Sequence, residues 1–185
     1  VNIDKEIIIV DDCSTDGTAE FLREISQKNI KVVSHKKNLG KGAAIRTGIA
    51  EVSGDYTIVQ DADLEYDPGE YHKLLAPILK DEAEVVFGSR FSGERKSMSL
   101  MHTLGNKFIT LATNIIYGKG ITDTETCYKV IKTSILKNLN LKATKFEFDP
   151  EVTAKILKRG IKIYEVPISY EGRNWDQGKK ITWRD

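Results

Sequence analysis

The sequence has few cysteines, no long apolar run and almost no net charge, and each shortage excludes a class of protein. Its two cysteines, Cys13 and Cys127, lack CxxC spacing, which argues against a disulfide framework and against a zinc site. No apolar run reaches the roughly 18 residues of a membrane span, and no signal-peptide pattern opens the chain. A net charge of +1 lacks the basic excess of a nucleic-acid binder. We therefore expect a soluble cytoplasmic domain whose partners are small anions or a local surface, not nucleic acid.

Short β-branched runs alternate with helical patterns through the first half of the chain. The predicted strands cover residues 6–10, 30–34, 56–59 and 84–87, and the predicted helices cover residues 18–28, 43–52 and 67–80. This alternation is typical of βαβ units and predicts an α/β fold with a mainly parallel sheet. The 185 residues suit one domain with a single core, since no linker or repeat divides them.

The segment YTIVQDADLE at residues 56–65 is the centre of the functional prediction. Its short β-branched run predicts a buried strand, and Asp61, Asp63 and Glu65 follow that strand directly. Ligands of open parallel sheets bind at the carboxyl ends of the strands, and two carboxylates one residue apart offer a divalent cation two oxygen ligands. The alternative is a solvated acidic turn.

Polar residues follow two further predicted strands. Asp11 and Asp12 come directly after the strand at 6–10, and Ser89 and Arg90 come after the strand at 84–87. Because the carboxyl ends of parallel strands share one edge of a sheet, this pattern favours a ligand cleft over scattered surface charge.

A glycine-rich turn, Gly40, Lys41 and Gly42, opens the predicted helix at 43–52. Glycines and a lysine at a helix N-terminus suit a diphosphate or sugar contact, although the spacing is not that of a Walker loop. The alternative is a simple loop and helix cap.

The second half of the chain contains a long apolar helix and a basic, aromatic end. The helix at residues 100–117 carries an apolar stripe, which we expect to pack in the core; the stripe consists of Leu100, Leu104, Phe108, Leu111 and Ile115. Part of it could instead face a lipid chain or a bilayer surface, because Arg95, Lys96 and Lys107 flank it. A strand at 128–131, a helix capped by Asp149 and a strand at 162–166 follow. Residues 170–185 are predicted to form a lid.

Together these motifs resemble family 2 glycosyltransferases, most closely the branch of dolichyl-phosphate mannose synthase and bacterial polyprenyl-phosphate enzymes. The matching motifs are VDDCSTDGT at 10–18, NLGKGA at 38–43, QDAD at 60–63, GSR at 88–90, GR at 172–173 and GKK at 178–180. The resemblance implies a GT-A fold, an Mg²⁺ or Mn²⁺ ion, inversion at the anomeric carbon and a nucleotide-diphospho-sugar donor of the GDP-mannose or UDP-glucose type. It covers nearly all of residues 1–185, with a donor-binding part at about 1–95 and an acceptor-side part at about 96–185.

The resemblance also implies roles for individual residues on the donor side. Asp11 and Asp12 would contact the donor nucleoside, with Gly40, Lys41 and Gly42 nearby.

On the catalytic side, Asp61 and Asp63 would be the metal-binding DxD pair, and Asp63 would be catalytic. Ser89, Arg90 and Arg173 would contact phosphate groups, and the two arginines would also act in catalysis.

Family members usually begin with a strand that precedes the Asp11 region, and this chain starts after that point. We therefore expect the first strand, and with it an edge of the donor pocket, to be missing. Where many relatives read SGFR, this chain has TCYK at 126–129, and Cys13 stands where glycine is common.

The implied reaction moves a hexose to a polyprenyl phosphate, which is already an anion and needs no general base. Such an enzyme would make peripheral contact with the cytoplasmic face of a membrane. A sugar hydroxyl acceptor would instead need a base, for which Asp123, Glu125 and Glu147 are candidates. A nucleotide-sugar-binding domain without turnover is a further alternative.

Overall fold

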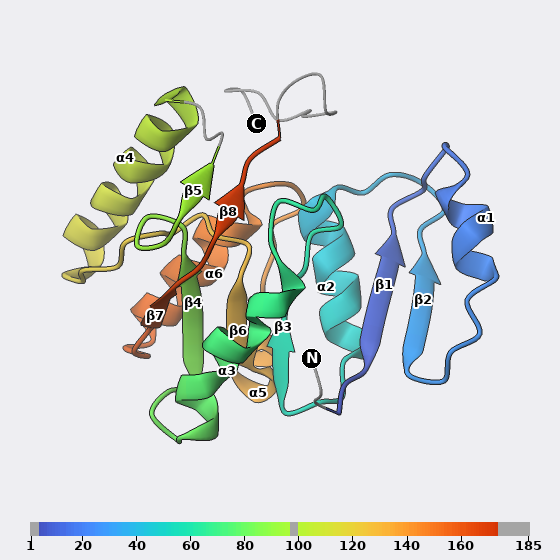
Figure 1. Cartoon of the computed structure of the whole chain (residues 1–185), viewed down its shortest axis with the longest axis horizontal. Helices are drawn as coiled ribbons and strands as arrows, with labels where there is room; N and C mark the ends of the chain where they lie inside the picture. Colours follow the sequence, from blue (N-terminus) through green and yellow to red (C-terminus); the bar gives the residue numbers. More distant parts are fainter. Residues whose placement is uncertain (1–3, 97–99, 174–185) are drawn as a thin grey trace. The chain divides into compact units, whose positions relative to one another are not determined.

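The computed structural model describes residues 4–96 and 100–173 (Figure 1). Contacts within the chain divide it into two compact units. The first unit contains residues 4–57 together with Lys132–Val152. The second unit contains the described residues of 58–131 and residues 153–173. The prediction of one domain with donor and acceptor parts that meet near residue 95 stays a prediction.

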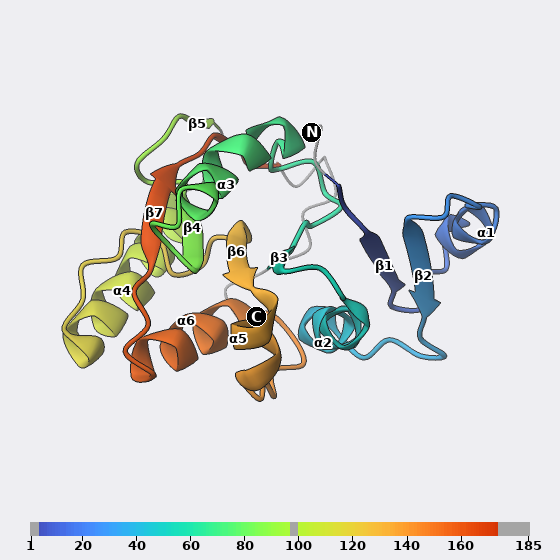
Figure 2. The ribbon, with the colours of Figure 1, turned by 90° about the horizontal axis from the view of Figure 1, so that it is seen from below.

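The first unit is built on two parallel strands, β1 (Ile7–Asp11) and β2 (Ile30–Ser34). Their β-branched sequences favour extended backbone, and the register pairs Ile7 with Ile30 and Asp11 with Ser34. Helices α1 (Thr18–Arg23), α2 (Lys41–Glu51) and α5 (Thr133–Asn138) complete the unit. In Figures 1 and 2, α1 lies beside β2 and α2 lies beside β1.

The main sheet has the strand order β3 (Tyr56–Ile58), β6 (Lys129–Lys132), β4 (Val85–Ser89) and β7 (Tyr164–Pro167). Strand β4 pairs antiparallel with β6 and parallel with β7, so the sheet is mixed. All five residues of β4 are buried, as expected for the apolar run at its centre. The α/β prediction is confirmed.

The remaining elements surround this sheet or extend from it. A 3₁₀ turn, η1 (Pro68–Glu70), leads into α3 (Tyr71–Leu79), and Asp67 caps the turn by accepting a hydrogen bond from the Gly69 amide at 2.8 Å. The others are α4 (Leu100–Tyr117), α6 (Phe148–Lys158), and the short parallel strands β5 (Arg95–Lys96) and β8 (Tyr170–Glu171).

Several predicted helix boundaries are wrong. Helix α1 ends at Arg23 instead of residue 28, because the amides of Glu24 and Ile25 bond to carbonyls three residues back and tighten the last turn. Helix α2 begins at Lys41, two residues before the predicted start. Helix α6 begins at Phe148, which places Asp149 in the first turn instead of at the cap.

The prediction that the apolar residues of helix α4 pack in the core is also wrong. Leu100, Leu104, Phe108, Leu111 and Ile115 are all at least 58% exposed. Polar side chains of the helix face the protein instead, and they form hydrogen bonds there. Within residues 4–96 and 100–173, no helix combines the length and the apolar character that a membrane crossing needs.

Candidate functional site

The acidic segment after β3 forms a tight loop in the second unit. Leu64 has a positive φ of 64° and a side chain that is 90% exposed, and the Glu65 amide donates to Asp63 Oδ1 at 3.1 Å. This turn keeps the partly buried carboxylates of Asp61, Asp63 and Glu65 within a few residues of one another. Burial raises the pKa of Asp63, and the charges of Glu65 and Asp61 raise it further, while the Glu65 amide and Arg173 act in the opposite direction. The loop therefore holds an excess of partly desolvated negative charge.

Arg173, which is more than 100 positions further along the chain, binds two carboxylates of this loop. Its Nη2 lies 3.1 Å from Asp63 Oδ2, its Nε lies 3.4 Å from Glu65 Oε1, and its backbone amide donates to the same Glu65 oxygen at 3.0 Å. The Tyr170 hydroxyl donates to Glu65 Oε2 at 2.8 Å, and the Glu171 amide donates to the Glu65 carbonyl at 3.1 Å. Glu65 thus holds β8 and Arg173 against the acidic loop. Its role was not foreseen, because its partners lie more than 100 positions away in the chain.

The donor set of this loop fits a divalent cation only in part. Among residues 4–96 and 100–173, no group of three or more His, Cys, Asp or Glu side chains is arranged to hold a metal ion. Asp61 and Asp63 offer carboxylate oxygens, and a cation beside them would relieve the repulsion that raises the Asp63 pKa. Mg²⁺ is commonly held by one or two carboxylates together with the phosphates of a bound nucleotide. The loop fits that mode of binding and not an all-protein cage.

The predicted phosphate ligand Arg90 lies inside the second unit, against Asp123. Its Nε and Nη2 donate to the two carboxylate oxygens of Asp123 at 2.7 and 2.8 Å, and its backbone amide donates to Oδ2 at 3.0 Å. The side chain of Asp123 is fully buried and Arg90 is 6% exposed. The Tyr170 ring lies 5.3 Å from the guanidinium carbon. In this arrangement Arg90 joins the strand end to the Asp123 loop.

The Ser89 side chain also has a hydrogen-bond partner within the protein. Its Oγ lies 2.6 Å from the Thr122 hydroxyl, and the backbone amides of Thr122 and Asp123 both donate to the carboxylate of Glu165 on β7. Burial raises the pKa of Glu165, although the hydrogen bonds from Thr122 and Asp123 oppose that shift. Glu165 therefore positions the loop that holds both Ser89 and Arg90. In the sequence, this role was indicated only by the presence of an acidic residue within a predicted strand.

A cluster of tyrosines lies close to the acidic loop. The Tyr66 ring lies 4.7 Å from that of Tyr128 and 5.3 Å from that of Tyr170, and Tyr71 adds a contact of 5.6 Å to Tyr128. The hydroxyls of Tyr71 and Tyr128 both donate to Gln60 Oε1. These rings stiffen the segment on both sides of Asp61 and Asp63 by packing and hydrogen bonding.

In the first unit, Asp12 holds the glycine-rich turn. Its carboxylate accepts hydrogen bonds from the Leu39 and Gly40 amides at 2.9 and 2.8 Å, and His35 Nδ1 lies 2.7 Å away. Burial tends to raise the pKa of Asp12, but the bonds from His35 and the two amides outweigh it and lower the pKa. His35 also contacts the Thr47 hydroxyl at 2.9 Å. The structure thus gives His35 the polar partners that the sequence did not reveal.

The glycines of this turn are required for packing within the first unit. Gly40 has a φ of 93° and a ψ of 160°, and a Cβ there would collide with the Thr144 carbonyl oxygen. A Cβ at Gly42 would lie 2.8 Å from the Ala143 and Lys145 carbonyl oxygens. Close approach of residues 143–145 therefore accounts for both glycines.

The last two predicted donor contacts have partners in the same unit. Lys41 Nζ lies 3.8 Å from Asp149 Oδ2 and 6.0 Å from the centre of the Phe146 ring. Asp11 is 5% exposed, and its Oδ1 accepts a hydrogen bond from the Ser14 amide at 3.1 Å. These contacts orient both side chains, and their donor-binding roles stay predictions.

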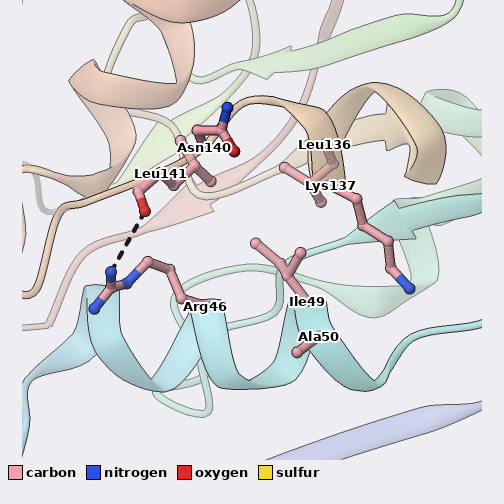
Figure 3. A pocket seen from close by; sticks show the side chains of 7 residues that line it. All are labelled: Arg46, Ile49, Ala50, Leu136, Lys137, Asn140 and Leu141. Atoms are coloured by element: carbon pink, nitrogen blue, oxygen red, sulfur yellow. Dashed lines mark hydrogen bonds between the residues drawn. The ribbon is translucent and has the colours of Figure 1, made fainter.

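A cavity of about 250 Å³ lies between α2 and α5 in the first unit (Figure 3). Arg46 stands at one end, where Nη1 donates to the Leu141 carbonyl at 3.4 Å, and Ile49 and Leu136 line the middle. No predicted site residue lines this cavity. Of the predicted lid at residues 170–185, Tyr170 and Glu171 form β8, and residues 174–185, with the GKK motif, lie outside the described residues.

Sequence comparison places the chain among sugar-transferring enzymes. The glycosyl transferase family 2 model matches residues 2–139. The chain is 32% identical over 169 residues to the low-salt glycan biosynthesis hexosyltransferase Agl6 of Haloferax volcanii, a match that covers 90% of this chain and 40% of Agl6. It is 32% identical over 183 residues to the UDP-N-acetylglucosamine–dolichyl-phosphate N-acetylglucosaminyltransferase of Methanococcus voltae, covering 88% of this chain and 73% of that enzyme.

A further relative is the dolichol-phosphate mannosyltransferase of Pyrococcus furiosus, which is 29% identical over 185 residues, covering 95% of this chain and 52% of that enzyme. The chain thus spans less than half of the length of Agl6 and about half of the P. furiosus enzyme.

Structure comparison finds the same fold. Glucosyl-3-phosphoglycerate synthase from Mycobacterium tuberculosis superposes with a TM-score of 0.67 at 20% identity, over 93% of this chain and 63% of that one. Its complex with Mn²⁺ and UDP-glucose gives 0.66 at 19% identity, over 92% and 61%. At this identity the likeness concerns the fold, which confirms the GT-A prediction. The family model extends over most of the chain, and on that ground the chain belongs to glycosyl transferase family 2 and is a glycosyltransferase domain of the GT-A fold.

Proposed function

We propose that this domain transfers a hexose from a nucleotide-diphospho-sugar to a polyprenyl phosphate. The names of the M. voltae and P. furiosus relatives, both dolichyl-phosphate sugar transferases, support this acceptor class. The observation that carries the proposal is the acidic loop itself, in which Asp61 and Asp63 stand beside Arg173. A transferase of this kind needs both charges, because a cation bound by the acids and a nearby arginine can stabilise a leaving diphosphate.

In this proposal Asp61 and Asp63 hold Mg²⁺ or Mn²⁺ together with the donor diphosphate. The cation would supply electrostatic stabilisation of the departing nucleoside diphosphate. The Mn²⁺ and UDP-glucose complex of the M. tuberculosis enzyme supports a divalent ion at a related fold. Arg173 would move from Asp63 towards the diphosphate and keep the charge of the site balanced. Asp11, Asp12, Gly40, Lys41 and Gly42 remain the proposed donor contacts.

Two of the three candidate bases are poorly suited to accept a proton, which favours an acceptor that is already an anion. Both oxygens of Asp123 are bonded to Arg90, so that carboxylate is already committed. Hydrogen bonds from the Thr144 and Lys145 amides lower the pKa of Glu147, which weakens it as a proton acceptor. An acceptor that is already anionic needs neither group, and its in-line attack on the anomeric carbon would invert the configuration there. Ser89, Arg90 and Arg173 remain the proposed groups around the acceptor phosphate, and Arg90 would reach it only by giving up its bonds to Asp123.

The test is transfer of radiolabelled sugar from a panel of nucleotide sugars, including GDP-mannose and UDP-glucose, with Mn²⁺ or Mg²⁺. Label extracted with the polyprenyl phosphate product, lost in Asp63→Asn and kept in Asp81→Asn, supports the proposal. Asp81 is a suitable control because it is an exposed aspartate of the same unit and has a positive φ of 56°, which asparagine tolerates well.

Two other results would replace the proposal. Label in a water-soluble saccharide would identify a hydroxyl acceptor. Donor binding without any transfer, with polyprenyl phosphate present, would identify a domain that binds nucleotide sugars without turnover. The cytoplasmic location stays a prediction.

A further inference from the structure

Helix α4 carries its apolar side chains on the outside. Figures 1 and 2 show the helix along the margin of the second unit. Seven of its apolar residues are between 58% and 81% accessible, and their spacings of one, three and four positions keep them on one side of the helix; we call the set of Leu100, Met101, Leu104, Phe108, Leu111, Ile115 and Ile116 the α4 stripe. An amphipathic helix of a soluble protein normally turns such a stripe towards the core. Here the stripe forms an apolar surface along the whole helix, of the kind that marks an interaction site.

Polar contacts hold the helix in this orientation. Thr110 is the buried residue of α4, and its hydroxyl accepts a hydrogen bond from the Thr124 amide at 3.2 Å. The Asn114 side chain donates to the Ile121 carbonyl at 2.8 Å and accepts from the Ile121 amide at 3.0 Å. Turning the stripe inward would break these three bonds and leave buried polar groups unpaired. The exposure of the stripe is therefore part of the fold.

Between Glu94 and Asp123, the charged residues of the sequence are of one sign. Residues 95–122 contain the four basic residues Arg95, Lys96, Lys107 and Lys119 and no acidic residue. Lys107 is exposed and lies seven positions after Leu100 and four before Leu111, so it borders the stripe directly. Long basic side chains beside an apolar helix face are typical of helices that lie in the interface of an anionic membrane, where the stems contact the apolar region and the charges reach the headgroups.

We propose that the α4 stripe docks on the surface of an anionic lipid bilayer, with α4 lying in the plane of the interface. The charge bias favours this occupant over a second copy of the chain, because two identical basic faces would repel each other. The same surface reaches the Arg90 region, since Lys107 Nζ and the Arg90 guanidinium lie 5.9 and 6.0 Å from the ring of Phe91. The inference requires no donor, metal or acceptor, so it stands apart from the proposed reaction.

The experiment is co-sedimentation of the whole chain with vesicles that contain no polyprenyl phosphate. Vesicles of phosphatidylcholine alone are compared with vesicles that include phosphatidylglycerol, at low and high salt. The variant Leu104→Ser with Phe108→Ser removes two stripe residues that are 63% and 73% exposed, so folding should be unaffected. Leu79→Ser is the matched control, because Leu79 is 75% exposed and lies on α3 in the same unit.

We expect binding to the phosphatidylglycerol vesicles that weakens with salt, falls at least roughly tenfold in the double variant and persists in Leu79→Ser. Circular dichroism melts of all three proteins should coincide. Absence of binding, or equal binding by the double variant, would overturn the proposal. A dimer in solution that becomes a monomer in the double variant would also overturn it, because the stripe would then be an interface between two copies.

Discussion

Arg173 Nη2 lies 3.1 Å from Asp63 Oδ2, although 110 positions separate the two residues. The contact joins the strand end that carries the acidic loop to the last described part of the chain. It keeps a guanidinium beside carboxylates whose shared charge would otherwise be unfavourable. A phosphate group that reaches this loop would find an arginine beside it, able to exchange Asp63 for the phosphate.

Arg173→Ala should reduce sugar transfer by roughly a hundredfold, because the site loses a positive charge at the leaving diphosphate. Arg173→Lys should recover part of that loss, since lysine keeps the charge but not the forked geometry. Steady-state kinetics with varied donor concentration would show the effect chiefly in kcat. An unchanged kcat in Arg173→Ala would remove Arg173 from the proposed chemistry.

The buried pair of Arg90 and Asp123 should behave as a single unit in stability measurements. Asp123→Ala should lower the free energy of unfolding by about 3 to 5 kcal/mol, because it leaves the Arg90 charge buried and unpaired. The double variant Arg90→Met with Asp123→Leu should lose less free energy of unfolding than Asp123→Ala, because it leaves no buried charge without a partner. Denaturant unfolding gives the free energy of unfolding of each of these variants.

The exposed pair of Arg23 and Glu20 serves as the control for this cycle, since its side chains are 74% and 68% accessible. Glu20→Ala should leave stability within experimental error. If Asp123→Ala were as harmless as Glu20→Ala, the buried pair would have no structural role.

Gly40→Ala should destabilise the first unit by at least about 2 kcal/mol more than Gly17→Ala does. Both glycines have a φ near 90°, at 93° and 88°. A Cβ at Gly17 meets no atom within 4 Å, whereas one at Gly40 collides with the Thr144 carbonyl, and its ψ of 160° is open almost only to glycine. Thermal melts of the two variants test this directly. Equal losses would mean that residues 143–145 do not constrain the turn.

The lowered pKa of Asp12 predicts how stability should depend on pH. A carboxyl group whose pKa is lower in the folded state contributes stability above its unfolded pKa of about 4 and loses it as the pH falls through the folded pKa. Asp12→Asn should therefore be less stable than the parent at pH 7, and the difference should shrink below pH 4. Melting temperatures from pH 7 to pH 3 measure it. A gap that stays constant over this range would show that the Asp12 charge does not hold the turn.

The sequence by itself determined the order of the elements and the chemistry at their ends. The β-branched runs before Asp11, Asp61 and Ser89 form strands, because strand propensity acts over a few neighbouring residues. Asp61 follows β3, whereas Asp11 and Ser89 are themselves the last residues of β1 and β4. The family motifs likewise pointed to the glycosyltransferase fold, since each is a short segment whose residue types are visible without any contact.

Only the tertiary structure decided which groups the motif residues meet and which face of α4 is exposed. Arg90 binds Asp123 from 33 positions away, and Glu65 meets Tyr170 and Arg173 across more than 100. The apolar period of α4 predicted the helix correctly but not its orientation, because Thr110 and Asn114 find hydrogen-bond partners beyond the helix itself. Such partners depend on how distant segments pack, and no local pattern records them.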